Sequence, residues 1–334
     1  MLEKPALADE TIIACLRENY DLRVAEIDFL PIGCDAAAWA YRAQLADGSA
    51  RFLKVRRGPL YEPALTVPHY LRDRGIAQVV GPLPAVTGAL WAAVDDFALI
   101  LYPYIEGRAG MEAGLTEQQW VEFGAVLKRI HMTPLSAELA GQIKQETFVP
   151  QWSHMVRRLQ AKIDAGDYGG PYQRELAAFW QTRRDEIRRI VERTEALGRM
   201  LQHQPPEFVL CHSDIHTANI LLDARGELHI VDWDNVLLAP IERDLMFVVG
   251  DDRTQPREAN LFLKGYGAAA INRLALAYYR YEWVVQEIGD FGERVFLMSD
   301  VGAETRAASV REFKQLFDPG DMVEAAYQTE SALQ

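Results

Sequence analysis

One segment constrains the fold of this chain more than any other, because it joins a polar loop to a predicted β-hairpin. Residues 211–235 read CHSDIHTANILLDARGELHIVDWDN. Two strand-like runs, NILL and ELHIVD, are connected by the favourable turn DARG. Neighbouring strands lie about 5 Å apart, so a hairpin would return Asn219, at the start of the first strand, and Asp232, at the end of the second, to the same edge. The pattern therefore predicts that both side chains can reach one cation.

The residue types at this edge suit phosphoryl transfer. An amide oxygen and a carboxylate are hard ligands, of the kind that hold Mg²⁺ together with substrate phosphates. Asp214 lies on the loop before the first strand, where it can orient an attacking hydroxyl and accept its proton. The spacing His212-x-Asp214-x-x-x-x-Asn219 is the catalytic-loop pattern of protein-kinase-like folds. Asp232 stands at the position of the metal-binding aspartate in that pattern.

Three other interpretations of this segment stay open on the sequence alone. HxDxxxxN fixes only three positions, and it also occurs in surface loops that precede an ordinary hairpin. The second is a metal-dependent hydrolase with zinc or a transition metal, which would leave the hairpin spacing unexplained. Its ligands would be His212, Asp214, His216 and Asp232, the first three sharing a face if their run is a strand. The third is a catalytically inactive kinase-like binding module, against which the presence of every core residue argues.

An upstream lysine supports the kinase interpretation. Within RFLKV, strand alternation places Phe52 and Lys54 on the same face. A lysine on an interior face needs an anionic partner, which nucleotide phosphates would supply, and Glu62 could also pair with it. Taken alone, Lys54 would be interpreted as an exposed lysine of an edge strand. Only the segment 211–235 favours nucleotide phosphates as the partner of Lys54.

The two halves of the chain differ in pattern. The first hundred residues are mainly short runs rich in aromatic and β-branched residues, typical of an antiparallel sheet, with one helix among them. Long amphipathic helices follow, and Thr116 is the expected N-cap of the first. We predict an α+β, two-lobed, protein-kinase-like fold with an N-terminal nucleotide-binding lobe over 1–104 and a larger, mainly helical catalytic and substrate-binding lobe over 105–334. The expected strands are 25–33, 36–45, 50–57, 90–94 and 97–105, and the expected helices begin near residues 63, 117 and 172.

Composition excludes several classes of function. The chain has 334 residues, enough for two domains, and its net charge of −13 disfavours nucleic acid as a partner. The N-terminus lacks the basic start and apolar run of a signal peptide, and no stretch is apolar enough to span a bilayer. Cys15, Cys34 and Cys211 form no CxxC pair. We expect a cytoplasmic monomer or weak dimer that binds a small cationic molecule and no membrane.

Several segments together resemble the aminoglycoside phosphotransferases, small-molecule kinases associated with antibiotic resistance. CHSDIHTANILL, IVDWD and APIERDLMFV have the order and spacing of that family's catalytic loop, metal aspartate and following helix. Further similar segments, such as SARFLKVRRG and LFDPGDMVEAAYQTE, extend the resemblance over nearly the whole chain. It implies transfer of the γ-phosphate of ATP or GTP, with Mg²⁺, to a hydroxyl of an aminoglycoside or aminocyclitol such as spectinomycin. Homoserine, choline or a thiosugar remains an alternative acceptor.

The resemblance also implies roles for individual residues. They are Asp214 as the catalytic base, Asn219 and Asp232 as metal ligands, Lys54 for the α and β phosphates, and His212 and Asp244 as structural supports of the catalytic loop. The N-cap of a helix LMFVVG is an almost equally good interpretation of Asp244.

For the nucleotide, the resemblance implies that the carbonyl of Pro103 and the amide of Ile105 face the base edge. Glu62 would belong to the same site. The loop PIGCDAAAWAY contains a single glycine, Gly33, where protein kinases carry several. The resemblance therefore leaves open how this loop binds the triphosphate.

A late helical segment, YYRYEWVVQEIGDF, supplies the candidate substrate residues. A polar pocket for the acceptor would be lined by Arg280, Glu282, Trp283 and Glu287, together with Asp234. The alternative is a surface helix whose charges are solvated and whose tryptophan packs in the core.

Overall fold

The chain folds into two units, and each is assembled from two separate stretches of sequence. The computed structural model describes residues 3–33, 35, 37–249, 255–299 and 301–333. The first unit comprises Met1–Lys144 and His212–Leu237, and the second comprises Gln145–Cys211 and Leu238–Gln334. The boundary predicted between residues 104 and 105 falls inside the first unit, so a division into lobes at that point stays a prediction.

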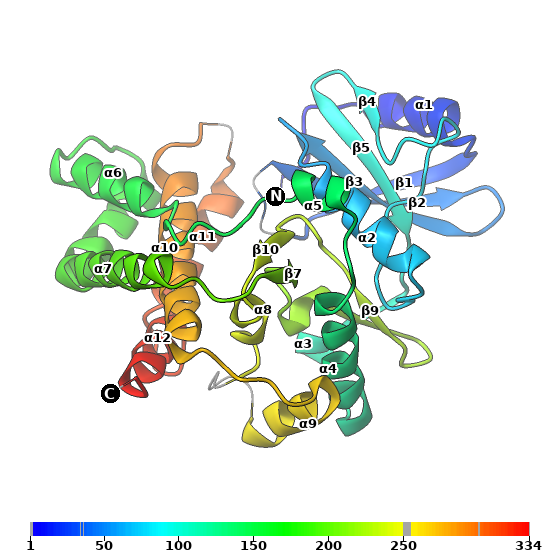
Figure 1. Cartoon of the computed structure of the whole chain (residues 1–334). Coiled ribbons are helices and arrows are strands. Elements are labelled where there is room, and N and C mark those ends of the chain that lie inside the picture. Colours follow the sequence, from blue (N-terminus) through cyan, green and yellow to red (C-terminus); the bar gives the residue numbers. More distant parts are fainter. Residues whose placement is uncertain (1–2, 34, 36, 250–254, 300, 334) are drawn as a thin grey trace. The chain divides into compact units, whose positions relative to one another are not determined.

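A five-stranded antiparallel sheet forms the N-terminal part of the first unit (Figure 1, blue and cyan). Its strands, in spatial order, are β1 (Val24–Leu30), β2 (Ala38–Leu45), β3 (Ala50–Arg57), β5 (Phe97–Pro103) and β4 (Ala92–Val94). The first three form the predicted meander. Lys54 lies on β3, opposite Ala40 on one neighbouring strand and Ile100 on the other. Because β3 is a central strand, the alternative of an edge-strand lysine is wrong.

Two helices accompany this sheet, and the sequence analysis predicts only the second. They are α1 (Asp9–Tyr20) and α2 (Pro63–Asp73). In α1 the residues Ile12, Cys15 and Leu16 have helical spacing and are buried. The hydroxyl of Tyr20 donates a hydrogen bond to the carbonyl oxygen of Leu99 on β5 (3.2 Å), which ties the end of α1 to the sheet.

The hairpin predicted from NILL and ELHIVD is present in the first unit. Three short strands form a sheet in the order β6 (Gly107–Ala109), β8 (Ile220–Asp223) and β9 (Leu228–Ile230). Asp223 Oδ1 accepts the backbone N–H of Arg225 (2.9 Å), which closes the turn. The N–H of Ile230 donates to the carbonyl of Gln78 (2.7 Å), and the N–H of Val80 donates to Ile230 (2.9 Å). The hairpin is thus bonded to the N-terminal stretch of its unit.

The described part of the first unit contains three further α-helices. They are α3 (Gly110–Ala113), α4 (Glu117–His131) and α5 (Ala137–Gln142). Thr116 is the N-cap of α4, as predicted: its Oγ1 accepts the N–H of Gln119 (3.3 Å), and Gln119 Oε1 accepts the N–H of Thr116 (2.8 Å). Such a cap contributes about 1 kcal/mol to stability.

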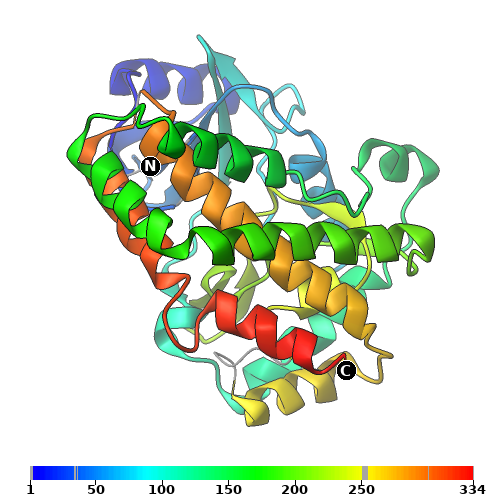
Figure 2. The ribbon, with the colours of Figure 1, turned by 90° about the vertical axis from the view of Figure 1, so that its left-hand side faces the viewer.

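The second unit is mainly helical. Its elements are α6 (Ser153–Asp164), α7 (Pro171–His203), β7 (Val209–Cys211), β10 (Leu237–Ala239), α8 (Glu242–Leu245), α9 (Pro256–Tyr266), α10 (Arg273–Phe296), α11 (Ala303–Gln315) and α12 (Met322–Ser331). The long helices α7 and α10 pack across one another (Figure 2, green and orange). α7 corresponds to the long charged helix that the sequence predicts near residue 172. Of the helices that the structure describes, none combines the length and the apolar character that a membrane crossing requires.

The thiols of Cys15 and Cys211 are free and buried. Cys34, the third cysteine of the sequence analysis, lies outside the described residues.

A glycine allows close packing against α7 and gives a test of the second unit. A Cβ at Gly198 would lie 2.3 Å from the carbonyl oxygen of Phe148 and 3.1 Å from the ring of Tyr278. Overpacking of this kind costs about 1–3 kcal/mol. We expect Gly198→Ala to lower the free energy of unfolding by about that amount, measured in urea. The control is Gly141→Ala on α5, where a Cβ meets no atom within 4 Å. There, helix propensity should raise stability by up to about 1 kcal/mol, and equal effects of the two substitutions would contradict the packing argument.

Candidate active site

A half-buried lysine held between two aspartates forms the centre of the site. Lys54 Nζ lies 3.0 Å from Asp232 Oδ1 and 2.7 Å from Asp234 Oδ2. The lysine side chain is 14% exposed and that of Asp232 is 46% exposed. Burial lowers the pKa of Lys54, but the charges of the two aspartates outweigh this effect and raise it above its ordinary value. The charge of Lys54 lowers the pKa of Asp232 against the opposing effect of burial. Lys54 and Asp232 are therefore held in their charged forms.

The partner of Lys54 differs from the one suggested by the sequence. Glu62 lies at the N-cap of α2, and among the described residues the ion pairs of Lys54 are with Asp232 and Asp234. The suggested pair with Glu62 is not formed. A role for Glu62 in the nucleotide site stays a prediction.

The candidate catalytic loop, residues 212–219, is closed by bonds from Asn219, the last residue of a short 3₁₀ turn (η1, Thr217–Asn219). Asn219 Nδ2 donates to the backbone carbonyl of Asp214 (2.7 Å) and lies 3.3 Å from Asp214 Oδ2. The N–H of Val231 donates to the carbonyl of Asn219 (3.0 Å). Asn219 and the residue before Asp232 thus meet at one edge of the hairpin, as the sequence predicts.

His212 joins the catalytic loop to the end of β9. Its side chain is fully buried, and its Nε2 lies 2.9 Å from the carbonyl oxygen of Val231. Because that oxygen can only accept, Nε2 carries a proton, and Nδ1 accepts the N–H of Asp214 (3.3 Å). The ring also packs against Trp233, with centroids 4.6 Å apart. These contacts fit the predicted supporting role.

The same geometry argues against a metal-dependent hydrolase. Residues 212–216 form a loop after β7 instead of the strand that would align the ligands. Both ring nitrogens of His212 already have hydrogen-bond partners. His216 Nε2 lies 3.4 Å from Asp214 Oδ1, within the catalytic loop.

Two residues at the site have a left-handed backbone. The φ angle is 71° at Ser213 and 62° at Asp232. This region is uncommon for residues other than glycine, although aspartate adopts it more readily than most. Such conformations persist where the surrounding structure enforces them, and they are frequent at functional sites.

The residues predicted to face the nucleotide base and phosphates also belong to the first unit. Gly33 lies between β1 and β2 with a φ of 85°, a conformation that favours glycine. Pro103 is the last residue of β5, opposite Arg51 on β3, and Ile105 lies between β5 and β6. Their contacts with a nucleotide stay predictions.

The sequence analysis misses a second basic residue in the cluster. Arg56 Nη1 lies 2.6 Å from Asp35 Oδ2 and 2.9 Å from Asp234 Oδ2. The alternation that places Lys54 on the inner face places Arg56 on it as well. The same rule could have identified it.

Arg280, a predicted substrate residue, is buried in the second unit. Its Nη2 donates to the carbonyls of Met246 (3.2 Å) and Val249 (2.9 Å). Its Nη1 donates to Thr329 Oγ1 (2.5 Å) on α12. These bonds join three segments of the unit and give Arg280 a structural role; its contact with substrate stays a prediction.

The other candidates on α10 lie in a less buried environment. Glu282 is 16% exposed and lies 3.9 Å from Arg243 Nη1. Burial raises the pKa of Glu282, and Arg243 opposes this effect. Trp283 packs edge-on against Phe247, with ring centroids 4.8 Å apart, and Glu287 is half-buried. Substrate binding by these residues stays a prediction.

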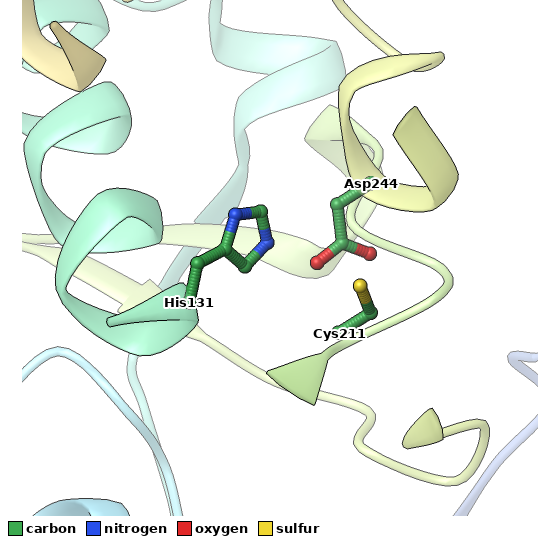
Figure 3. Close-up of side chains that lie close together, drawn as sticks. All are labelled: His131, Cys211 and Asp244. Atoms are coloured by element: carbon green, nitrogen blue, oxygen red, sulfur yellow. The ribbon is translucent and has the colours of Figure 1, made fainter. Parts of the chain in front are cut away.

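Asp244 lies inside α8, whose N-cap is Ile241, so the alternative of a helix N-cap is wrong. Its side chain is fully buried. The carboxylate is directed at the thiol of Cys211, within 4.8 Å (Figure 3). Burial raises the pKa of that thiol, and the charge of Asp244 adds to the effect. Asp244 therefore lies near Cys211, the residue that immediately precedes the candidate catalytic loop.

Comparison with known proteins identifies the family. The model of the phosphotransferase enzyme family, APH, matches residues 28–279. The chain belongs to this family. The resemblance inferred from the catalytic loop and the metal aspartate is thereby confirmed.

Solved structures share the fold of this phosphotransferase. Spectinomycin phosphotransferase APH(9)-Ia, in complex with ADP and spectinomycin, is 30% identical with a TM-score of 0.85, over 98% of this chain and 99% of that chain. Amicoumacin kinase hAmiN, in complex with AMP-PNP, Ca²⁺ and Ami, has a TM-score of 0.59 at 19% identity, over 95% of each chain. A relative found by sequence, Protein StrN of Streptomyces griseus, is 27% identical over 312 residues, 88% of this chain and 89% of StrN. The predicted α+β kinase-like fold is confirmed.

The bonds of His212 give a test of the site's architecture. We expect His212→Ala to lower the free energy of unfolding by about 2–3 kcal/mol, because it removes a buried ring and leaves two backbone groups without partners. His203→Ala, at the exposed end of α7, is the matched control and should change stability by less than about 0.5 kcal/mol. Urea unfolding measures both. Equal stabilities would contradict the supporting role of His212.

Proposed function

We propose that this phosphotransferase transfers the γ-phosphate of ATP or GTP to a hydroxyl of spectinomycin or a closely related aminocyclitol antibiotic. The observation that carries the proposal is the likeness to spectinomycin phosphotransferase over 98% of the chain, at a TM-score of 0.85. That relative holds ADP and spectinomycin in its structure. Modification of such an antibiotic would confer resistance, and the need for ATP or GTP fits a cytoplasmic enzyme.

Asp214 would act as the general base. The acceptor hydroxyl oxygen forms a bond to the γ-phosphorus while the bond from that phosphorus to the β-phosphate oxygen breaks, and the nucleoside diphosphate leaves. The hydroxyl proton passes to the carboxylate of Asp214. Asn219 supports this role because its Nδ2 fixes the backbone of Asp214 at 2.7 Å.

Lys54 would bind the nucleotide phosphates. In the structure its ammonium is held by Asp232 and Asp234. Phosphate oxygens are anionic partners of the same kind. The lysine can therefore exchange carboxylates for phosphates, and its positive charge stays balanced.

Asn219 and Asp232 have the donor chemistry for Mg²⁺. Because Asn219 Nδ2 is bonded to Asp214, its amide oxygen is the atom that remains for a cation. Asp232 adds a carboxylate that is about half exposed, at 46%. Two oxygen donors supplemented by phosphate oxygens and water are typical of Mg²⁺ sites. The ion would neutralise charge on the transferred group.

The acceptor would be held through its positive charge. In the second unit we assign Glu282, Glu287, Trp283 and Arg280 to acceptor binding, and in the first unit Asp234 is a further candidate carboxylate. The net charge of −13 is compatible with a cationic substrate.

Replacement of the proposed base should separate chemistry from nucleotide binding. We expect Asp214→Asn to lower kcat by roughly a hundredfold or more, the usual effect of removing a general base, with nucleotide affinity close to wild type. Asp185→Asn on α7, where the side chain is 74% exposed, is the matched control. Steady-state kinetics and nucleotide titration measure the two properties. Turnover of Asp214→Asn near that of wild type would remove Asp214 from the mechanism.

An acceptor screen tests the substrate. Purified protein with Mg²⁺ and either ATP or GTP is assayed for phosphate transfer to spectinomycin, aminoglycosides, homoserine, choline and a thiosugar. We expect transfer to spectinomycin that stops when EDTA removes the metal. At saturating nucleotide, the KM for spectinomycin should rise between low and physiological salt, because salt screens the attraction between partly exposed charges.

Transfer to homoserine, choline or the thiosugar, with none to any antibiotic, would overturn the substrate assignment and leave the kinase assignment in place. If spectinomycin is phosphorylated, Glu282→Gln and Glu287→Gln identify which carboxylates contribute to its binding. Substitution of a contributing carboxylate should raise the KM for spectinomycin and weaken the dependence of that KM on salt.

A further inference from the structure

Arg56 occupies a position on β3 that points to a phosphate-binding role. It lies two residues beyond Lys54 on the same face of the strand. In the register of the sheet, Lys54 is opposite Ala40, whereas Arg56 is opposite Ala38, the first residue of β2. Ala38 follows directly on the loop that contains Gly33. Arg56 is therefore nearer than Lys54 to the loop that covers the phosphates in kinase-like folds.

Among the residues that the structure describes, Arg56 pairs with two carboxylates from separate segments of the same unit. Its Nη1 lies 2.6 Å from Asp35 Oδ2 in that loop and 2.9 Å from Asp234 Oδ2 after β9. Asp35 is itself oriented, because its Oδ1 accepts the N–H of Ala37 (2.7 Å). The Arg56 side chain is 26% exposed. Its guanidinium is thus held in place and still accessible to a ligand.

The charges of the cluster favour exchange of a carboxylate for a phosphate. One oxygen, Asp234 Oδ2, accepts from both Lys54 Nζ (2.7 Å) and Arg56 Nη1 (2.9 Å). An incoming triphosphate brings more negative charge than one lysine and one divalent cation can neutralise. A guanidinium is permanently charged, and its donor geometry matches phosphate oxygens.

We infer that Arg56 is a nucleotide-binding residue that contacts the terminal phosphate, which displaces Asp35 and Asp234 from its guanidinium. The inference rests on the proposed phosphotransfer from a nucleoside triphosphate. It also accounts for a loop with a single glycine: a side-chain cation beneath the loop supplies the charge compensation that a series of backbone amides supplies in glycine-rich loops.

The test compares triphosphate and diphosphate binding in the full-length chain with Mg²⁺. Isothermal titration first measures wild type with AMP-PNP and GMP-PNP, and the tighter analogue is then used with its diphosphate. We expect Arg56→Gln to raise the Kd of the triphosphate analogue about tenfold or more, as for loss of a charge-assisted bond. The Kd of the diphosphate should change by less than about threefold, since it lacks the terminal phosphate. Arg56→Lys, which keeps the charge, should fall between wild type and Arg56→Gln.

Two further variants exclude a merely structural effect. Arg51→Gln alters the same strand on its opposite face, where Arg51 Nη1 contacts the carbonyl of Ala50 (2.8 Å), and it should leave both affinities unchanged. Asp35→Asn removes the competing charge, so the triphosphate analogue should bind as tightly as to wild type or more tightly.

The outcomes separate this inference from the proposed function. Failure of wild type to bind any nucleotide would overturn both. If wild type binds and Arg56→Gln behaves like Arg51→Gln, or weakens both nucleotides equally, only the role of Arg56 falls. If Asp35→Asn weakens the triphosphate as much as Arg56→Gln does, the pair is a structural clamp and the exchange of partners is wrong.

Discussion

The pairing of one lysine with two aspartates organises the first unit. Lys54 comes from the middle of a sheet formed early in the sequence, and Asp232 and Asp234 follow it by 178 and 180 residues. A half-buried ammonium without anionic partners would be costly, so the sheet and the segment after β9 stabilise one another. The other features of the site depend on that segment. His212 is bonded to Val231, and the N–H of Val231 in turn is bonded to Asn219.

Local rules account for the parts of the fold and site that the sequence predicts. Alternation along β3 placed Lys54 on the inner face, and the turn DARG set the hairpin that brings Asn219 to the end of β9. A capping pattern located the start of α4 at Thr116. Arg56 follows from the same alternation as Lys54 and could have been predicted. Helix α1 also has a helical pattern, at Ile12, Cys15 and Leu16, within a stretch otherwise rich in strand signals.

The remainder depends on contacts between residues far apart in the sequence. Glu62 is the first acidic residue after Lys54 along the chain, but the observed partners lie on a distant segment whose approach no local pattern reveals. Arg280 is a charged residue in a segment that suggests a polar pocket. It is buried because its guanidinium donates to the carbonyls of Met246 and Val249 and to the hydroxyl of Thr329. Burial of a charged side chain is decided by such tertiary partners. The left-handed conformations of Ser213 and Asp232 likewise have no marker in the sequence.

The discontinuous first unit has a consequence for the order in which the protein folds during synthesis. The stretch Met1–Lys144 leaves the ribosome before its complement, His212–Leu237, has been translated. Lys54 therefore spends most of the synthesis of the chain without Asp232, and the segment Gln145–Cys211, which belongs to the other unit, emerges in between. Domains generally fold as units once their residues are available. The five-stranded sheet can form early, but the cluster that would engage a nucleotide is completed only after the hairpin has emerged from the exit tunnel.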